Sequence, residues 1–521
     1  MAHLPSYLRR TVISLWILGI VLLYALHFAH LTADFPAVPQ WKDASVLTDE
    51  GWYLNAPTRY ALTGHWYLPG DFNPAIALPV WPLFAALLFH FTGPGMVPAR
   101  ALAVALFGIA IVCLALLLRR RSPLWIVLLV VSFAVSSPFL FAFSRVALVE
   151  PLLLCLLAAA MLLADHADGA QRASRHWTLM VILGAILLSM MLAKISALFL
   201  YPAALYLLWS RLRANLRRAL SSFALLAAMV GGGYTLYVRV VSRLGYEPDF
   251  RYFYTSNVFG HPVTLKGWII SLWFGVMDLW WTCGWLAILA AVVFLASLTA
   301  PLRSLWSESL YVASVVLIVG TSAFIYARDY HAPHYYLFTP FGFAIIVALG
   351  LRAATEKIPL RYASLLVLPI VVLLGVSAIR MVALVRHPTY TFRNAANSIN
   401  GIIARDPSSR HLLLGDSGDQ ITLATRGVLS INDSYGASPL REEIRLRDPG
   451  WFAPWDAVNP ETLAELHTRY HLQRIAVFPV SSDPGRFVLL FYRLVPLSQP
   501  ETGVLVRKSR LKLYRRPPSG P

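Results

Sequence analysis

Residues 97–118 read VPARALAVALFGIAIVCLALLL, and Arg119-Arg120-Arg121 follow directly. A helix needs about 20 mainly apolar residues to cross the hydrocarbon core of a bilayer, so this stretch predicts one membrane-spanning helix. Lys and Arg collect on the cytoplasmic side of membrane proteins, so the three arginines predict that this helix ends in the cytoplasm. Comparable apolar runs recur between Thr11 and Leu384. The chain is therefore expected to cross the membrane many times.

The composition agrees with a polytopic membrane protein. Hydrophobic residues make up 58% of the 521 residues and charged residues only 13%, whereas about a quarter of a soluble domain is charged. A soluble or disordered protein is therefore disfavoured. The net charge is +18, but most arginines sit in short gaps between apolar runs, which indicates sorting across a membrane and not a nucleic-acid-binding face. The three cysteines lie within apolar runs, so neither a disulfide framework nor a metal cluster is expected.

One membrane topology places all the strongly basic loops between the predicted spans on the cytoplasmic face. It counts eleven spans and treats residues 78–91 as a helix in the outer interface, because Pro79 and Pro82 interrupt a stretch that is too short to cross. Counting that stretch as a span would move Arg119–Arg121 outside. The first run, after Arg9-Arg10, is expected to be a retained anchor with a cytoplasmic N-terminus. The predicted spans are residues 11–31, 97–118, 124–143, 147–164, 177–193, 195–209, 219–241, 268–296, 309–327, 335–351 and 362–384.

Two parts are expected under this topology. Residues 1–384 form the membrane module, in which residues 32–96 are the first outer loop, with interfacial helices and an acidic portion over residues 32–77. Residues 385–521 have ordinary polarity, and short β-rich runs alternate there with a helical stretch, which predicts an extracytoplasmic α/β domain. The expected strands are residues 411–414, 474–480, 487–494 and 511–514, and the expected helix is residues 460–470.

The first outer loop contains two adjacent acids, Asp49 and Glu50. Two neighbouring carboxylates can supply a general base and a partner that orients it. The alternative is the N-terminus of a helix over residues 51–62, where acidic residues cap the backbone and are stabilised by the helix dipole. Arg59, in the same loop, is a further candidate for binding a lipid phosphate. The dipeptide alone leaves both interpretations open.

Two joints between predicted spans carry ionisable groups beside apolar runs. Arg145 and Glu150 flank the first joint, and Lys194 interrupts the apolar stretch 177–209. At about 1.5 Å per residue this stretch is too long for one crossing, so an outer turn is expected at Lys194. Ionisable groups so close to hydrocarbon are candidates for function. The alternative is that their long side chains snorkel to the interface or form structural ion pairs.

Residues 328–336 bring Arg328, His331, His334 and Tyr335 into one outer loop. A guanidinium group and imidazoles suit phosphate oxygens. A metal site has less support, because two histidines three residues apart need further ligands, and an interfacial belt of Tyr and His is another alternative. Together with the acidic pair and Lys194, these groups are expected to line one outer cavity that suits a phosphate-bearing lipid.

Several of these stretches occur in a characteristic order: TDEGWY at 48–53, LTGHW at 62–66, residues 79–93, PAR at 98–100, SRVALVE at 144–150, LAK at 192–194 and HYYL at 334–337. In this order they resemble the GT-C membrane glycosyltransferases, in particular the family 39 branch of protein O-mannosyltransferases and aminoarabinose transferases. The resemblance covers about residues 1–351. It implies a GT-C-like helical membrane fold of about eleven spans.

The resemblance also implies an activity. Such enzymes move a sugar from a polyprenyl-phosphate carrier to a glycan, lipid or protein acceptor outside the cytoplasm, usually with inversion. By this resemblance Asp49 is the general base and Glu50 orients it or the acceptor. Lys194 and the charged groups of the 328–334 loop, namely Arg328, His331 and His334, stabilise the departing lipid phosphate. The expected location is the bacterial plasma membrane, with no nucleic-acid partner.

Two departures from the family pattern leave the sugar and the acceptor undefined. Glu150 stands where the family commonly has Asp, and Asn73-Pro74-Ala75 replaces a Glu-Lys pair of the aminoarabinose transferases. The sequence indicates no particular cofactor. Whether a divalent metal ion is needed is left undecided, because related enzymes differ in metal dependence.

Two other classes of protein remain as alternatives. A secondary transporter or lipid flippase would place ionisable groups near mid-membrane at broken helices, and Asp278 within residues 268–296 is the main residue in such a position. The third candidate is an inactive scaffold in a polysaccharide assembly complex. No Walker, H-E-x-x-H or G-x-S-x-G motif occurs, which disfavours a nucleotide-driven pump and the common hydrolases.

Overall fold

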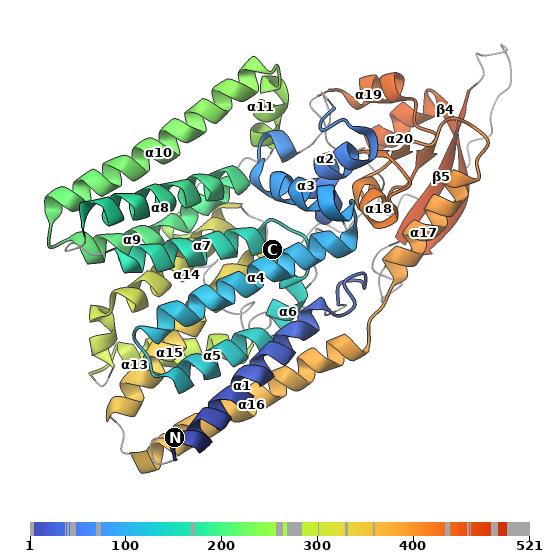
Figure 1. Cartoon of the computed structure of the whole chain (residues 1–521). Helices are drawn as coiled ribbons and strands as arrows, with labels where there is room; N and C mark the ends of the chain where they lie inside the picture. Colours follow the sequence, from blue (N-terminus) through green and yellow to red (C-terminus); the bar gives the residue numbers. More distant parts are fainter. Residues whose placement is uncertain are drawn as a thin grey trace.

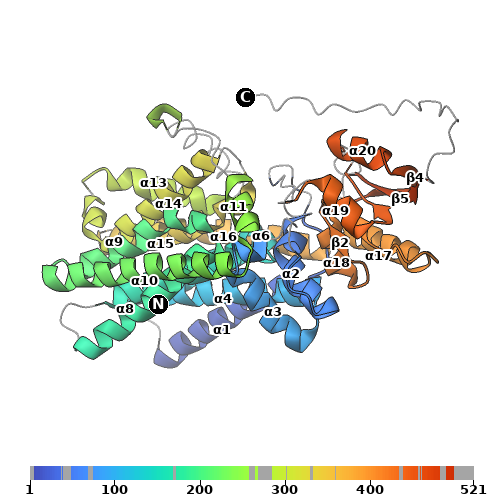
Figure 2. The same cartoon turned by 90° about the horizontal axis from the view of Figure 1, so that it is seen from above.

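The structure is a computed structural model, and it describes residues 5–36, 38, 41, 48–68, 74–167, 172–256, 264–267, 284–300, 302–328, 332–357, 360–432, 438–455, 458, 460–480 and 488–497. A bundle of long helices forms the larger part, and a smaller α/β unit lies at one end of it (Figures 1 and 2). The bundle helices are α1 (Ser6–Ala25), α4 (Met96–Arg119), α5 (Leu124–Ser136), α6 (Pro138–Ser144), α7 (Glu150–His166), α8 (Ala173–Ala193), α9 (Tyr201–Leu212), α10 (Leu216–Arg243), α13 (Trp285–Ser297), α14 (Ser309–Arg328), α15 (Thr339–Lys357) and α16 (Leu360–Arg386).

The chain is a multi-pass membrane protein with at least seven candidate spans. Within the described residues, seven helical stretches are long and apolar enough to cross a bilayer, and the bent pair α5–α6 makes an eighth. This pair bends by 62° at Ser137-Pro138, because proline has no N–H to continue the helical hydrogen bonds. All eleven predicted spans overlap a helix, although residues 268–283, with Asp278, lie outside the described part. The count of eleven stays a prediction.

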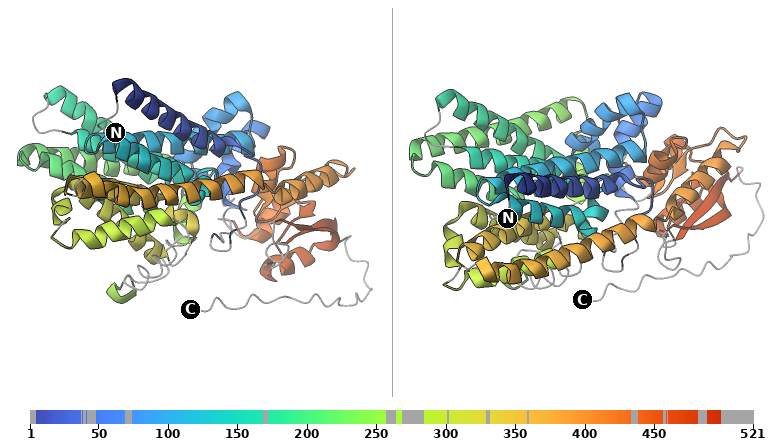
Figure 3. Two further views of the ribbon diagram at one scale, coloured as in Figure 1. Left: turned by 90° about the horizontal axis from the view of Figure 1, so that it is seen from below. Right: turned by 60° about the horizontal axis from the view of Figure 1, so that its bottom comes forward.

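The solvent exposure of the side chains distinguishes helices in the core of the bundle from helices on its lipid-facing side. In α5, every residue from Ile126 to Ser136 is buried, which matches a helix that is apolar on all sides. Helices α1 and α16 pack against α5 from outside (Figure 3). No residue of α1 is buried, and Leu15 and Leu22 are largely exposed. Such apolar exposure is stable only where lipid tails cover it, so α1 lies at the edge of the bundle.

The loops predicted to be cytoplasmic lie at one end of the helix bundle, and those predicted to be outside lie at the other. At one end, Asp165 accepts hydrogen bonds from Arg121, at 2.8 Å, and from Arg120 and Arg211. Arg352 also donates to the carbonyl of Arg121. These arginines come from three loops that the sequence assigns to the cytoplasm. The joints assigned to the outside meet at the opposite end, beside the α/β unit.

Short helices cover that opposite end. They are α2 (Asp49–Thr63), α3 (Val80–Thr92) and α11 (Glu247–Ser256), with the 3-10 turns η1 (Leu26–Phe28), η4 (Pro74–Ile76), η5 (Ile195–Phe199) and η7 (Pro333–Phe338); a further turn, η6 (Arg303–Ser307), lies elsewhere in the bundle. With 13 residues, α3 is too short to cross a bilayer, as expected for residues 78–91.

The α/β unit is built on a five-stranded sheet with the order β2-β1-β3-β5-β4. β1 pairs in parallel with β2 and β3, whereas β5 is antiparallel to both of its neighbours. Three expected strands and the helix are present with shifted ends, and residues 511–514 lie outside the described residues. The elements are α17 (Thr391–Ala404), β1 (Leu413–Leu414), α18 (Gly418–Thr425), β2 (Ser430–Ile431), α19 (Leu440–Arg447), β3 (Trp451–Phe452), α20 (Pro460–His467), β4 (Tyr470–Pro479) and β5 (Val488–Pro496).

Candidate active site

Glu50 is buried, and its hydrogen bonds connect four segments of the chain. Its carboxylate accepts hydrogen bonds from Arg100 Nε at 2.7 Å and Arg100 Nη2 at 2.5 Å. It also accepts from the backbone N–H of Ala147 at 2.7 Å and from Gln420 Nε2 at 2.8 Å. Four donors fill about all the lone-pair positions of a carboxylate. Glu50 therefore fixes the start of α2 to α4, to the joint before α7 and to α18.

Gly51 lets α2 approach α18 more closely than any other residue would. Its N–H donates to Gln420 Oε1 at 2.5 Å. A Cβ at Gly51 would lie 2.1 Å from the backbone nitrogen of Gln420, and a backbone atom cannot move aside as a flexible side chain can. The α/β unit is thus held directly against the helix that carries both acids (Figure 1).

Replacing Gly51 by Ala is expected to force α2 and α18 apart. Overpacking of this kind costs about 1–3 kcal/mol, so the midpoint of thermal unfolding in detergent should fall. Gly401→Ala is the matched control, because it lies on α17 of the same unit and a Cβ there meets nothing within 4 Å. If both variants unfold at the wild-type temperature, the close contact between α2 and α18 at Gly51 does not contribute to stability.

Asp49 lies next to Glu50 but in different surroundings. It is half-buried at the first position of α2, and Thr48 donates its hydroxyl to Asp49 Oδ1 at 2.9 Å. Successive residues of a helix point about 100° apart, since 3.6 residues make a turn. Tyr53 lies one turn further along α2 than Asp49, and its ring lies beside the ammonium group of Lys194, which is described next.

Glu150, Lys194 and His334 meet at the same end of the bundle. Lys194 Nζ lies 2.6 Å from Glu150 Oε1, and His334 Nε2 lies 3.8 Å from the same oxygen. The ammonium group also sits over the ring of Tyr335 at 4.7 Å and that of Tyr53 at 5.8 Å. Within the described residues, Glu150 Oε2 is buried without a hydrogen-bond donor. The cluster thus holds a cation against two aromatic faces with one acceptor oxygen unused.

Backbone geometry explains how these side chains converge. Lys194 ends α8 in an extended conformation, with φ −166° and ψ 125°, so the chain turns there as predicted. Glu150 begins α7 with Pro151 after it, and proline is favoured in the first turn of a helix because its missing N–H is not needed there. His334 and Tyr335 belong to η7, just before α15. Burial raises the pKa of Tyr53 well above its usual range, although the charge of Lys194 opposes this; the phenol stays protonated.

The structure does not bring all the candidate residues to this cluster. Arg59 is buried and donates from Nη2 to the carbonyl of Ser430 at 3.2 Å, so it joins α2 to β2. Arg145 donates to the carbonyls of Ala29 and His30 and faces a separate cavity. Arg328 is the last residue of α14, but its side chain lies outside the described part, as does His331.

Two residues of the site, Arg100 and Gln420, were not predicted to be functional from the sequence. Arg100 stands inside the apolar run 97–118, and an intramembrane charge is a signal of function or of a buried pair; its partner Glu50 lies 50 residues earlier. Gln420 lies 370 residues after Glu50, and no local pattern marks it. Within the described residues, no group of three or more His, Cys, Asp or Glu side chains could hold a metal ion.

Two comparisons, with protein-family models and with solved structures, find proteins similar to this chain. Residues 89–239 match the family model described as Dolichyl-phosphate-mannose-protein mannosyltransferase. This segment includes Arg145, Glu150 and Lys194. A search of curated proteins by sequence finds no match. The chain has the GT-C fold of membrane glycosyltransferases, as the resemblance implied.

Particular solved structures share this fold. Two structures of ArnT from Cupriavidus metallidurans, one in the apo state and one bound to undecaprenyl phosphate, each match with a TM-score of 0.58 and 14% sequence identity. Each match covers 92% of this chain and 98% of ArnT. An oligosaccharyltransferase from Archaeoglobus fulgidus, in complex with Zn and sulfate, matches with a TM-score of 0.52 and 12% identity over 88% of this chain and 72% of that one. At these identities the likeness concerns the fold.

Proposed function

We propose that the protein transfers a sugar from a polyprenyl-phosphate carrier to an acceptor hydroxyl at the outer face of a bacterial plasma membrane. The observation that carries the proposal is the meeting of Tyr53, Glu150, Lys194 and His334 at one end of a GT-C bundle, with Asp49 one turn before Tyr53 on α2. Support for the carrier comes from the ArnT structure with undecaprenyl phosphate. The α/β unit lies at the same end and is proposed to be extracytoplasmic.

In the proposed reaction Asp49 accepts the proton of the acceptor hydroxyl as its oxygen attacks the anomeric carbon. The bond between that carbon and the phosphate oxygen breaks, its electron pair stays on the phosphate, and the anomeric configuration inverts. Lys194 provides positive charge beside the departing phosphate, which is most effective in a water-poor site. Glu150 positions the ammonium group, and Glu50 positions Asp49 through the start of α2.

The direct test uses purified protein and synthetic polyprenyl-phosphate sugars with a radioactive sugar. Release of free polyprenyl phosphate together with labelled acceptor supports the transferase. Uptake or flipping of the intact donor by proteoliposomes without any cleavage would instead support a transporter or flippase. A protein that neither cleaves nor moves any of the donors across a panel of sugars would contradict both.

Lys194→Met should lower the transfer rate about 10²-fold, since loss of one stabilising charge or donor at the reaction centre has that scale. It also leaves Glu150 buried without its cation, so stability must be measured separately. The double variant Glu150→Gln with Lys194→Met removes both charges, and it should recover stability but not activity. Lys266→Met, an exposed lysine, is the control. Wild-type activity in Lys194→Met would contradict the role given to this residue.

A further inference from the structure

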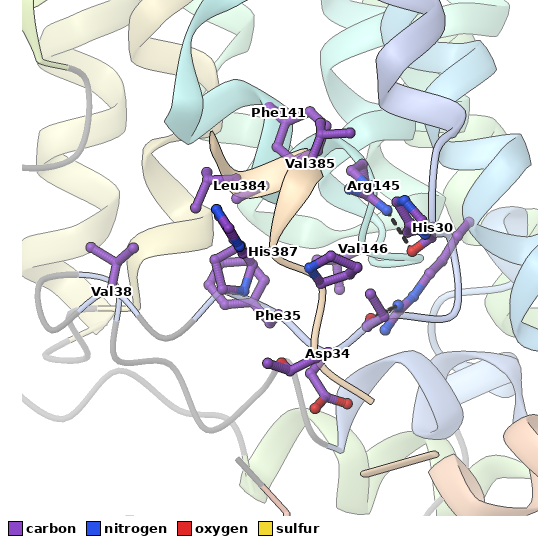
Figure 4. A pocket seen from close by; sticks show the side chains of 16 residues that line it. His30, Asp34, Phe35, Val38, Phe141, Arg145, Val146, Leu384, Val385 and His387 are labelled. Atoms are coloured by element: carbon purple, nitrogen blue, oxygen red, sulfur yellow. Dashed lines mark hydrogen bonds between the residues drawn. The ribbon is translucent and has the colours of Figure 1, made fainter. Parts of the chain in front are cut away.

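A cavity lies beside the joint between α6 and α7. It has a volume of about 310 Å³ and is bounded by the segment after η1, by the end of α6 and by the end of α16 (Figure 4). Three nitrogen-bearing side chains, His30, Arg145 and His387, enter it from these three segments (Figure 4). Lys194 and Glu150 do not line it. The cavity is therefore separate from the cluster of Glu150, Lys194 and His334, although Arg100, the partner of Glu50, also lines it.

Arg145 supplies a positive charge that nothing described neutralises. Its Nη2 donates to the carbonyl of His30 at 2.7 Å and to that of Ala29, and its guanidinium group lies 4.6 Å from the centre of the Phe141 ring. Among the described residues, no carboxylate forms an ion pair with Arg145. Burial, together with the charge of Arg100, lowers the pKa of Arg145 to about 10, so the group stays cationic at neutral pH.

The other charged residues of the cavity are already engaged. Arg100 is neutralised by Glu50. Asp34 accepts three hydrogen bonds at the start of α17, from the N–H and the hydroxyl of Thr391, at 2.6 and 2.7 Å, and from the N–H of Phe392 at 3.2 Å. Its carboxylate lies away from Arg145 in Figure 4. Asp34 keeps its negative charge at the start of α17, but around Arg145 itself two imidazoles and no paired carboxylate among the described residues leave this side of the cavity locally positive and suited to an anion.

The remaining lining is apolar and continues onto the lipid-facing side of the protein. Phe35, Phe141, Leu384 and Val385 contribute to the wall. Leu384 and Val385 belong to the last turns of α16, whose outer side exposes large apolar residues such as Ile379, which is 71% exposed. The charged part of the cavity therefore lies where a lipid-facing helix ends, which is the level of lipid headgroups.

We propose that this cavity binds the phosphate of an anionic glycerophospholipid, with an acyl chain along the apolar end of α16. Arg145 offers N–H donors to the phosphate oxygens, a pairing that guanidinium groups favour. His387 and His30 complete the polar side. Zwitterionic lipids are disfavoured because their headgroup brings a second cation beside Arg145. The site serves lipid binding and not sugar transfer.

The test measures lipid binding to the full chain after delipidation in a neutral detergent. Phosphatidylglycerol, phosphatidylcholine, polyprenyl phosphate and inorganic phosphate are added separately, and bound lipid is counted by native mass spectrometry alongside the thermal midpoint. We expect phosphatidylglycerol to bind and to raise the midpoint, with little effect of phosphatidylcholine or inorganic phosphate. Equal effects of the two glycerophospholipids, an effect of inorganic phosphate alone, or binding of polyprenyl phosphate alone would overturn the proposal.

Three variants identify the site. Arg145→Gln should weaken phosphatidylglycerol binding about tenfold or more, because a charge-assisted hydrogen bond contributes at least that factor. His387→Ala, at an exposed position, should weaken it severalfold, and this variant keeps the proposal testable if Arg145→Gln does not fold. Arg386→Gln is the matched control, since Arg386 is exposed beside the cavity but does not line it. Wild-type affinity in both Arg145→Gln and His387→Ala, or an equal loss in Arg386→Gln, would overturn the proposal.

Lys194→Met separates this inference from the proposed function. It should keep wild-type phosphatidylglycerol binding even though transfer falls. Loss of lipid binding in a folded Lys194→Met variant would mean that the cavity and the Lys194 cluster act as one site, which contradicts the inference and leaves the transferase proposal intact.

Discussion

Asp49→Asn should reduce sugar transfer about 10²- to 10⁴-fold, the range that a general base contributes. Asparagine keeps the size of the side chain and still accepts the hydrogen bond from Thr48, but it cannot take a proton from the acceptor. The start of α2 should stay in place, because the buried contacts of Glu50 hold it and are unchanged in this variant. The measurement is the rate of donor cleavage at saturating acceptor, with the thermal midpoint recorded for the same sample.

Two comparisons make this result specific. Asp49→Glu retains a base but moves it by one methylene group, so partial activity is expected. Glu442→Gln removes an exposed acid from α19 of the α/β unit and should leave the rate unchanged. Asp49→Asn with wild-type turnover would end the assignment of Asp49 as the base.

Glu50→Gln should have its main effect on stability. Glu50 is fully buried and paired with Arg100, whose side chain is itself 9% exposed. Removing one member of a buried ion pair costs about 3–5 kcal/mol, because the other charge stays buried without compensation. The NH2 group of the glutamine would also face one N–H donor, that of Ala147 or that of Gln420, whereas the carboxylate accepts from both. We expect a clear fall in the thermal midpoint and a loss of activity that follows the loss of folded protein.

The control for this prediction is Glu247→Gln on α11, since the Glu247–Arg251 pair is largely exposed and exposed pairs contribute little. The double variant Glu50→Gln with Arg100→Gln should recover part of the lost stability, because no unpaired charge remains buried. A single Glu50→Gln variant as stable as wild type would show that the pair does not hold α2 in place.

The fold was predictable because its signals are local and repeated. Apolar runs of spanning length, the turn at Lys194 and the proline-interrupted stretch before residue 92 each follow from a few neighbouring residues, and the structure confirms them. The number of spans is not equally well defined: α7 has 17 residues, and a helix of this length is at the lower limit for crossing.

The candidate site was predictable only in part. The sequence placed Glu150, Lys194, His334 and Tyr335 at one outer surface, and the structure brings them into contact. The resemblance assigns different tasks to Asp49 and Glu50, but the buried contacts of Glu50 could not be predicted, because its partners Arg100 and Gln420 lie far away along the chain. Arg145 and Glu150 were both candidates for function at the same joint, but the non-helical segment between them directs Arg145 to the cavity beside α16 and Glu150 to Lys194.

The contact between Gly51 and Gln420 also bears on how an acceptor can reach the site. Since α2 is hydrogen-bonded to the α/β unit at this point and to α4 through Arg100, any movement of the outer unit against the bundle would also displace Asp49, the proposed base. We therefore expect the acceptor to be selected by a preformed entrance and not by closure of the α/β unit over the site.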